Sequence, residues 1–256
     1  MKKILPLALW AGAAWAQAIT DPPPILQIVR KPGFATAAIR PYADARATIN
    51  VMGLSAVTGL PETWFVETHP NFASIEALDQ ALNAAGVPRA AGAAFEGGQD
   101  DVLAPARTMI AIYHPNYSYR PDQAARMLAR ARYMHVTVYR VRGGTESDFA
   151  SLVNLRRANL DSVNLDRPDM AYEVVSGAPS GTYIFLSPIA SLRAMDEGTP
   201  NTPVYAQGLA DARAKAKSTS APSDIGREHL LFRMEPRLSY VSDDFAAADA
   251  AFWRGK

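Results

Sequence analysis

The sequence predicts an α+β protein built from two tandem copies of a strand–helix–strand–strand–helix–strand unit. Three observations lead to this prediction. The phrase HPNYSYRPD at residues 114–122 returns as EPRLSYVSD at residues 235–243, with Pro, Ser, Tyr and Asp in the same order. The segments before each phrase also match in an unbroken order along the chain. In both halves, short β-rich runs alternate with helical segments, which is typical of α+β domains.

Each half is expected to contain four strands and two helices. The first-half strands are expected at about 25–31, 51–58, 63–68 and 107–114, and the second-half strands at about 134–142, 170–176, 181–187 and 228–235. Gly/Pro turns at 59–61 and 177–181 should join the second and third strands as hairpins. Helices are expected at about 35–50 and 145–163, and shorter ones begin near Ser74 and Ser191, which are suitable N-caps.

This order is that of the ferredoxin-like βαββαβ unit, in which helices cover one face of a four-stranded antiparallel sheet. Two units on one chain can pack their bare faces together, sheet to sheet, as a fused α/β barrel. The mature chain therefore resembles a single-chain version of the dimeric α/β-barrel superfamily, most closely secreted bacterial members with the same Ser-Tyr repeat and no assigned activity. The resemblance implies a functionally mixed group, which includes cofactor-free monooxygenases, haem-degrading enzymes and haem-dependent chlorite dismutases.

Residues 1–18 have the pattern of a secretory signal peptide. The basic start Met1-Lys2-Lys3 precedes an apolar run at 4–15, and the small-residue motif AQA ends at Ala18. We therefore expect an exported protein, periplasmic or extracellular. Its first repeat should occupy 19–120, a linker helix 121–133 and the second repeat 134–256. The proline and aspartate that begin the 121–133 segment are typical of a helix N-terminus.

Composition limits the partners and the chemistry. Loss of Lys2 and Lys3 with the leader takes the formal charge from +1 to −1, which gives no electrostatic case for nucleic acid or an anionic membrane surface. No other apolar run is long enough to span a membrane. The absence of cysteine excludes zinc–thiolate, iron–sulfur and cysteine-nucleophile chemistry. The sequence leaves the oligomeric state open, because a fused barrel is already complete as a monomer.

Candidate ligand-binding residues come from strand alternation in the second half. Residues 135, 137 and 139 share one face of the first strand, opposite the apolar Val136 and Val138. The last strand alternates in the same way around Leu230 and Phe232. We expect the wholly apolar faces to lie under the helices and the mixed faces to line the interior between the sheets. The residues predicted to share one cavity wall are His135, Tyr139, His229, Arg233 and Glu235.

Two interpretations of these five residues remain open. Histidine can ligate haem iron or act as a base, and arginine can hold an anionic group. Alternatively, the residues satisfy one another across the seam between the sheets, with Arg233 pairing with Glu235 or with a carboxylate of the first repeat. No metal-ligand cluster is indicated and no motif marks a haem ligand, so the sequence names no cofactor.

Three function hypotheses follow. The first is an exported protein that binds a small, largely apolar ligand in the cavity between the sheets. The second is a haem-dependent or cofactor-free oxidoreductase, which needs His135 or His229 to open into a cavity. The third is a protein-interaction module that uses Phe252-Trp253 or the long segments at 86–106 and 197–226. The sequence does not decide whether the chain is an enzyme. The repeated Ser-Tyr phrase itself is interpreted as structural, with both tyrosines packing at the end of the barrel.

Overall fold

The computed structural model describes residues 19–35, 42–43, 47–86, 107–162, 166–196 and 225–255. The expected signal peptide at 1–18, most of the expected helix at 35–50 and most of the two long segments at 86–106 and 197–226 lie outside these residues. Eight antiparallel strands form a closed barrel in the order β1-β3-β2-β8-β5-β7-β6-β4. None of the described helices is long and apolar enough to cross a membrane.

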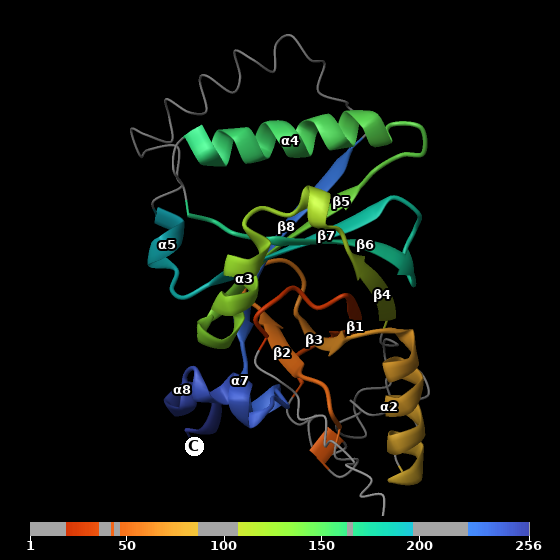
Figure 1. Cartoon of the computed structure of the whole chain (residues 1–256), viewed down its shortest axis with the longest axis vertical. Helices are drawn as coiled ribbons and strands as arrows, with labels where there is room; N and C mark the ends of the chain where they lie inside the picture. The colour runs from red at the N-terminus through yellow and green to blue at the C-terminus, as the bar shows by residue number, and fades with distance from the viewer. Residues whose placement is uncertain are drawn as a thin grey trace, which may run out of the picture.

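The strands and helices follow the two halves of the sequence (Figure 1). The first-half strands are β1 (Ile25–Pro32), β2 (Val51–Ala56), β3 (Glu62–His69) and β4 (Arg107–Tyr113), with helix α2 (Phe72–Ala84). The second-half strands are β5 (Tyr133–Arg140), β6 (Met170–Ser176), β7 (Thr182–Ile189) and β8 (Gly226–Met234), with helices α4 (Glu146–Ser162) and α5 (Arg193–Asp196). Helix α3 (Pro121–Met127) links the halves, and α7 (Asp243–Ala247) and α8 (Ala250–Arg254) end the chain. Short 3₁₀ helices are η2 (Pro115–Tyr117), η3 (Leu128–Arg130) and η4 (Pro236–Leu238).

The predicted fold class is confirmed. Each half keeps the ferredoxin-like order, β4-β1-β3-β2 in the first and β8-β5-β7-β6 in the second. The two sheets face each other and also pair along their edges, β2 with β8 and β4 with β6. We call these two edge pairings the seams. Every predicted strand is present, with its ends within about two residues of the expected positions, which is the usual uncertainty of element boundaries.

The repeated Ser-Tyr phrase closes both seams. In the first copy, the Ser118 hydroxyl accepts a hydrogen bond from the backbone N–H of Ala171 on β6 at 2.9 Å. In the second copy, the Ser239 hydroxyl accepts one from the N–H of Gly53 on β2, also at 2.9 Å. Each serine also donates to the carbonyl of the first residue of its own phrase. The two copies therefore play equivalent structural roles, each tying its own half to the other half.

The tyrosines of the phrase continue the same seams. Tyr119 exchanges two backbone hydrogen bonds with Asp169, and Tyr240 exchanges two with Val51. The Tyr119 hydroxyl donates to the carboxylate of Asp161 at 2.7 Å, and the Tyr240 hydroxyl donates to a first-half backbone carbonyl at 3.0 Å. The expectation that both tyrosines pack and hydrogen-bond at the barrel end is confirmed.

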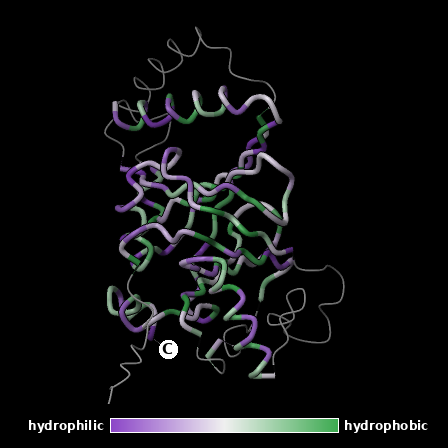
Figure 2. The backbone as a smooth tube through the Cα atoms, turned by 45° about the vertical axis from the view of Figure 1, so that its right-hand side comes forward, coloured by the Kyte–Doolittle hydropathy of each residue, from purple (hydrophilic) through white to green (hydrophobic). Residues whose placement is uncertain are grey.

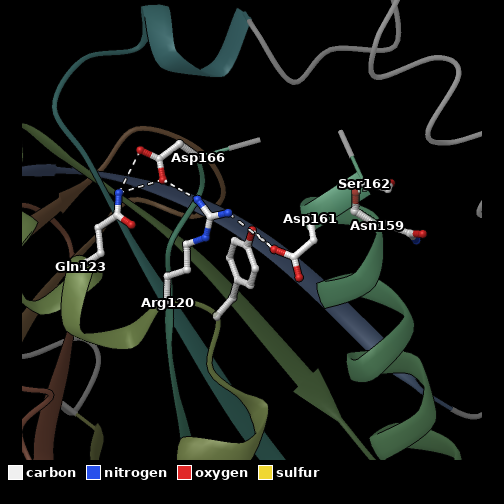
Figure 3. A network of polar contacts seen from close by, with 7 residues as sticks. Arg120, Gln123, Asn159, Asp161, Ser162 and Asp166 are labelled. Atoms are coloured by element: carbon white, nitrogen blue, oxygen red, sulfur yellow. Dashed lines mark hydrogen bonds and ion pairs between the residues drawn. The ribbon is translucent and has the colours of Figure 1, made fainter. Parts of the chain in front are cut away.

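A polar network beside Tyr119 anchors the C-terminal end of α4 (Figure 3). Arg120 lies between two carboxylates, 3.5 Å from Asp161 and 3.4 Å from Asp166. Gln123 donates to both oxygens of Asp166, at 2.8 and 2.9 Å. Arg120 has a φ of 46°, and no other non-glycine residue in the described part of the chain has a positive φ. The network links Arg120, the residue before α3, to the last turn of α4 and to Asp166.

Side chains from all eight strands fill the barrel interior. Trp64, Tyr172 and Phe232 lie there fully buried. The other strand residues of this core are Leu26, Ile28, Met52, Leu54, Val66, Met109, Ala111, Met134, Val136, Val138, Met170, Val174, Ile184, Leu186, Leu230 and Met234. Residues of α3, η3, α7 and α8 belong to the same cluster and extend it beyond the strands. Trp253 is among them, 5% exposed and donating its indole N–H to the carbonyl of Ala129. A buried, hydrogen-bonded Trp253 counts heavily against an interaction module that uses Phe252-Trp253.

The prediction of which strand face lies inside was wrong. Val136 and Val138 point into the barrel, and Tyr139 belongs to a separate cluster on the outer, helix-facing side. The reason is that a closed barrel interior is the driest part of the molecule, so it takes the wholly apolar faces. The outer face is only partly covered: α4 alternates polar and apolar residues along its length (Figure 2) and buries only Phe149 and Val153.

Removal of either seam serine should destabilise the barrel. Ser118→Ala and Ser239→Ala each leave a backbone N–H of the partner strand without its acceptor, and we expect the free energy of unfolding to fall by about 1–3 kcal/mol. Urea denaturation measures this. Ser151→Ala is the matched control, because its hydroxyl bonds only within the exposed surface of α4. Seam variants that unfold at the wild-type urea concentration would contradict the account of the seams.

Candidate functional site

Two histidines form a pair on the outer face of the second-half sheet. His135 on β5 and His229 on β8 stack with ring centroids 5.4 Å apart and planes 20° apart. Thr137 is the register partner of His229, and its hydroxyl lies 3.1 Å from the Nδ1 of that ring. His135 is the next residue along β5 that faces the same way, so the two rings are diagonal neighbours on adjacent strands. We call His135 and His229 the imidazole pair.

The fold lowers the pKa of both rings of the imidazole pair, which favours their neutral forms at pH 7. Burial first, and then interactions with His229, Arg167 and Arg156 in that order, lower the pKa of His135 to about 4. Burial also lowers the pKa of His229, with added effects of Arg227 and Arg156. A neutral imidazole offers one N–H donor and one nitrogen lone pair. Each ring can therefore accept a proton, donate or accept a hydrogen bond, or serve as a single metal ligand.

Arg156 of α4 lies beside the imidazole pair. Its guanidinium stands 5.5 Å from the ring centroid of Phe185, which is the register partner of Thr137. The Nη2 atom contacts the carboxylate of Asp169, a fully buried residue. Burial raises the pKa of Asp169, while Arg156 acts to lower it. The Nη1 atom is itself buried and has no hydrogen-bond partner among the described residues. One edge of the guanidinium thus has no hydrogen-bond partner among the described residues, and its charge acts on both imidazoles.

The other predicted site residues lie elsewhere. Tyr139 faces outward with the imidazole pair but packs under α4, with its ring 5.2 Å from those of Phe149 and Phe185. Arg233 and Glu235 pair with each other at 2.7 Å. For these two residues the structure shows the mutual pairing that the sequence left open, and neither lines the barrel interior.

Sequence reasoning missed Arg156, and no local signal separates it from its neighbour Arg157. Both arginines lie in the middle of a helix with weak amphipathic character. Arg157 donates to the backbone carbonyl of Asn116 at 2.8 Å, whereas Arg156 turns toward the sheet and Asp169. The difference arises from the way α4 packs on the sheet, which a single sequence does not reveal.

The outer face of the first half also carries a buried polar cluster, but its members satisfy one another. The Tyr42 hydroxyl donates to Glu67 at 2.5 Å, and His69 lies 3.3 Å from the other oxygen of Glu67. His69 Nδ1 is 3.0 Å from the Ser74 hydroxyl, which donates its own proton to a backbone carbonyl at 2.7 Å. Because that proton is already used, Ser74 is not an activated nucleophile. Within the described residues, no three His, Asp or Glu side chains gather to hold a metal ion.

Comparisons with known proteins find similar solved structures at low sequence identity. No protein-family model matches the chain, and no curated protein does. A structure assigned as a monooxygenase from Fusobacterium nucleatum subsp. nucleatum is similar at 9% identity and TM-score 0.46, over 83% of this chain and 92% of that one. A chlorite dismutase from Candidatus Nitrospira defluvii, carrying the substitution R173E, has 10% identity and TM-score 0.46, over 86% and 94%. An anthrone oxidase-like protein has 12% identity and TM-score 0.45, over 83% and 92%.

The expected fused α/β barrel is confirmed by the chain's own strand topology. At such low identity the similarity concerns the fold, because one fold hosts many unrelated functions. What this chain binds has to be inferred from its own side chains.

The imidazole pair should make stability depend on pH. The pKa of His135 is about 4 in the folded protein, against an ordinary value of 6.5, so the unfolded chain binds the proton more readily. The contribution of His135 is therefore complete above pH 6.5 and is lost as the pH falls toward 4. Because the side chain is partly exposed, we expect an effect on the order of 2 kcal/mol.

Urea denaturation of the wild type and of His135→Gln at several pH values between about 4 and 7 measures this effect. The free energy of unfolding of the variant should fall less steeply across that window. Parallel curves for the two proteins would show that His135 is not held neutral by the fold.

Proposed function

We propose that the chain is a small-molecule binding protein whose ligand docks on the outer face of the second half, at the imidazole pair. The observation that carries this proposal is the buried, unpartnered Nη1 of Arg156 beside two neutral imidazoles. Buried polar atoms in proteins are nearly always hydrogen-bonded, so an unused donor needs a ligand atom or an ordered water to complete it. His229 is exposed and His135 partly exposed, which leaves the pair accessible.

The barrel interior is a poorer place for the small apolar ligand expected from the sequence. An occupant there would have to displace packed side chains such as Trp64 and Phe232, whose rings lie 4.8 Å apart. On the outer face, an apolar part of the ligand would meet Leu231, the partly exposed register partner of His135 on β8. We further propose that the ligand is met after export, on the basis of the signal-peptide pattern at 1–18.

An oxidoreductase that uses haem is the second candidate, and His135 is the observation that favours it. Neither of its ring nitrogens has a hydrogen bond to a described residue, and burial keeps it neutral down to about pH 4. A neutral, unengaged imidazole has the chemistry of an axial iron ligand, and Arg156 could meet a propionate. Bound haem would supply the redox chemistry, while the chain would position it and set its surroundings.

A fragment screen on protein labelled with ¹⁵N at histidine tests the first candidate. The chain has four histidines, which makes His69 and His114 internal controls. We expect small aromatic fragments that bind to shift the imidazole signals of His135 and His229, and to leave His69, which is buried, unchanged. Binding fragments that shift neither member of the imidazole pair would contradict the proposed site.

Titration with hemin tests the second candidate. A saturable Soret band that is lost in His135→Ala or His229→Ala, and kept in His114→Ala, would favour the oxidoreductase. The variant that loses the band would identify the histidine that ligates the iron. A spectrum that remains that of free hemin at an equal amount of protein would exclude this candidate.

A further inference from the structure

We infer that the group recognised at the imidazole pair is an anion, a carboxylate or a phosphate, which Arg156 and the two imidazoles bind while taking up a proton. This inference rests on the proposed function, because it names the ligand class of the same site. The proposed function requires only that a small molecule binds at the imidazole pair. The inference also requires that the bound group is an anion, so an experiment can contradict the inference and leave the proposed function standing.

The charges around the pair favour an anion. Arg156 of α4 acts electrostatically on both imidazoles, Arg167 from the segment before β6 acts on His135, and Arg227 of β8 acts on His229. Among the described groups that shift the pKa of either imidazole there is no carboxylate, and the carboxylate of Asp169 is already paired with Arg156. The surroundings therefore carry more positive than negative charge, and a free anion is attracted while a metal cation is repelled.

The geometry of the rings also favours an anion over a metal ion. The lone pair of each ring nitrogen lies in the plane of its ring, and the two ring planes are only 20° from parallel. The two lone pairs therefore do not point at one metal ion, which needs its ligands at near-tetrahedral angles. Nearly parallel N–H donors suit the separate oxygens of a carboxylate or phosphate. With the Nδ1 of His229 against the Thr137 hydroxyl, its Nε2 is the nitrogen that remains for a ligand. The unused Nη1 of Arg156 adds a charged donor.

Binding an anion should draw a proton into the site. Burial, and after it the charges of the arginines, favours the neutral form of the free imidazoles, and an anion that offsets the arginine charges raises the affinity of the pair for protons. By linkage, a ligand that adds protons binds more tightly as the pH falls. Affinity should therefore rise from about pH 7 to about pH 5, by at most about tenfold per pH unit for each proton taken up.

Calorimetric titration of the full mature chain at about pH 6 tests the inference. The probes are sodium benzoate, benzamide and inorganic phosphate, each in two buffers of different ionisation enthalpy. Benzamide has the shape of benzoate without its charge. We expect benzoate or phosphate to bind at least about tenfold more tightly than benzamide, which is the difference that one charged hydrogen bond makes. The two buffers should give different apparent enthalpies, which report the proton taken up.

Arg156→Lys keeps a charge for Asp169 but removes the second guanidinium edge, so it should weaken the anion about tenfold while the fold is retained. Arg157→Lys is the matched control, since Arg157 bonds a backbone carbonyl away from the pair. The comparison of benzoate with benzamide needs no variant at all, so a folding defect cannot obscure the result.

Each result decides one of the two ideas. Equal binding of benzamide and benzoate, or anion binding without proton uptake, would overturn the anion inference and leave a ligand site in place. If neither anion binds but other fragments shift the imidazole signals, the anion inference is likewise overturned and the ligand site remains. If no ligand of any kind moves those signals, the proposed function itself is overturned.

Discussion

The barrel depends on the hydrogen bonds with which each half closes the sheet edge of the other. A single βαββαβ unit would leave the edges of its second and fourth strands unpaired, and exposed edges invite association with other chains. Ser118 and Ser239 supply one acceptor to each seam, and the adjacent tyrosines extend the pairing. Gly53 shows how close this approach is, because an added Cβ would lie 2.5 Å from the Cβ of Leu238. The repeated phrase therefore forms part of the interface between the two halves of the chain, once at each seam.

Closure of the barrel determines where function can lie. The apolar strand faces fill the interior, so the polar residues are directed to the outer, helix-facing side. Strand β8, which carries His229, is held between β5 of its own half and β2 of the other. The imidazole pair therefore rests on strands that the seam fixes, while Arg156 reaches it from a helix that buries few side chains. A rigid sheet with one lightly packed helix over it is a suitable support for a ligand site.

The strands were predictable because turn residues and alternation mark them locally. The linker helix was also predictable, although its last turn tightens into η3. Which face points inward was not predictable by the same logic, because it depends on how completely each side of the sheet is covered. The strand registers make Ile25 of β1 equivalent to Tyr133 of β5, because each pairs with the last residue of the third strand of its half.

The candidate site was predictable only in part. His135 and His229 were paired correctly, because the first and last strands of the unit are neighbours. Arg233 and Glu235 were assigned to the same wall, but a residue pair two apart on one strand face satisfies itself. Arg156 was not predicted, because the side of α4 that faces the sheet is determined by tertiary packing. Contacts of that kind follow from the folded structure and leave no pattern in one sequence.

The central claim is that the fold holds two adjacent imidazoles neutral beside a guanidinium with an unused edge. Titration of the four histidine ring signals by ¹⁵N NMR, from about pH 3.5 to about pH 8, tests this claim most directly. The account predicts that His135 titrates near pH 4 and that His229 titrates below the ordinary histidine pKa of 6.5, with both rings neutral at pH 7. Midpoints at or above 6.5 for both residues would contradict it, because the pair would then be ordinary surface histidines.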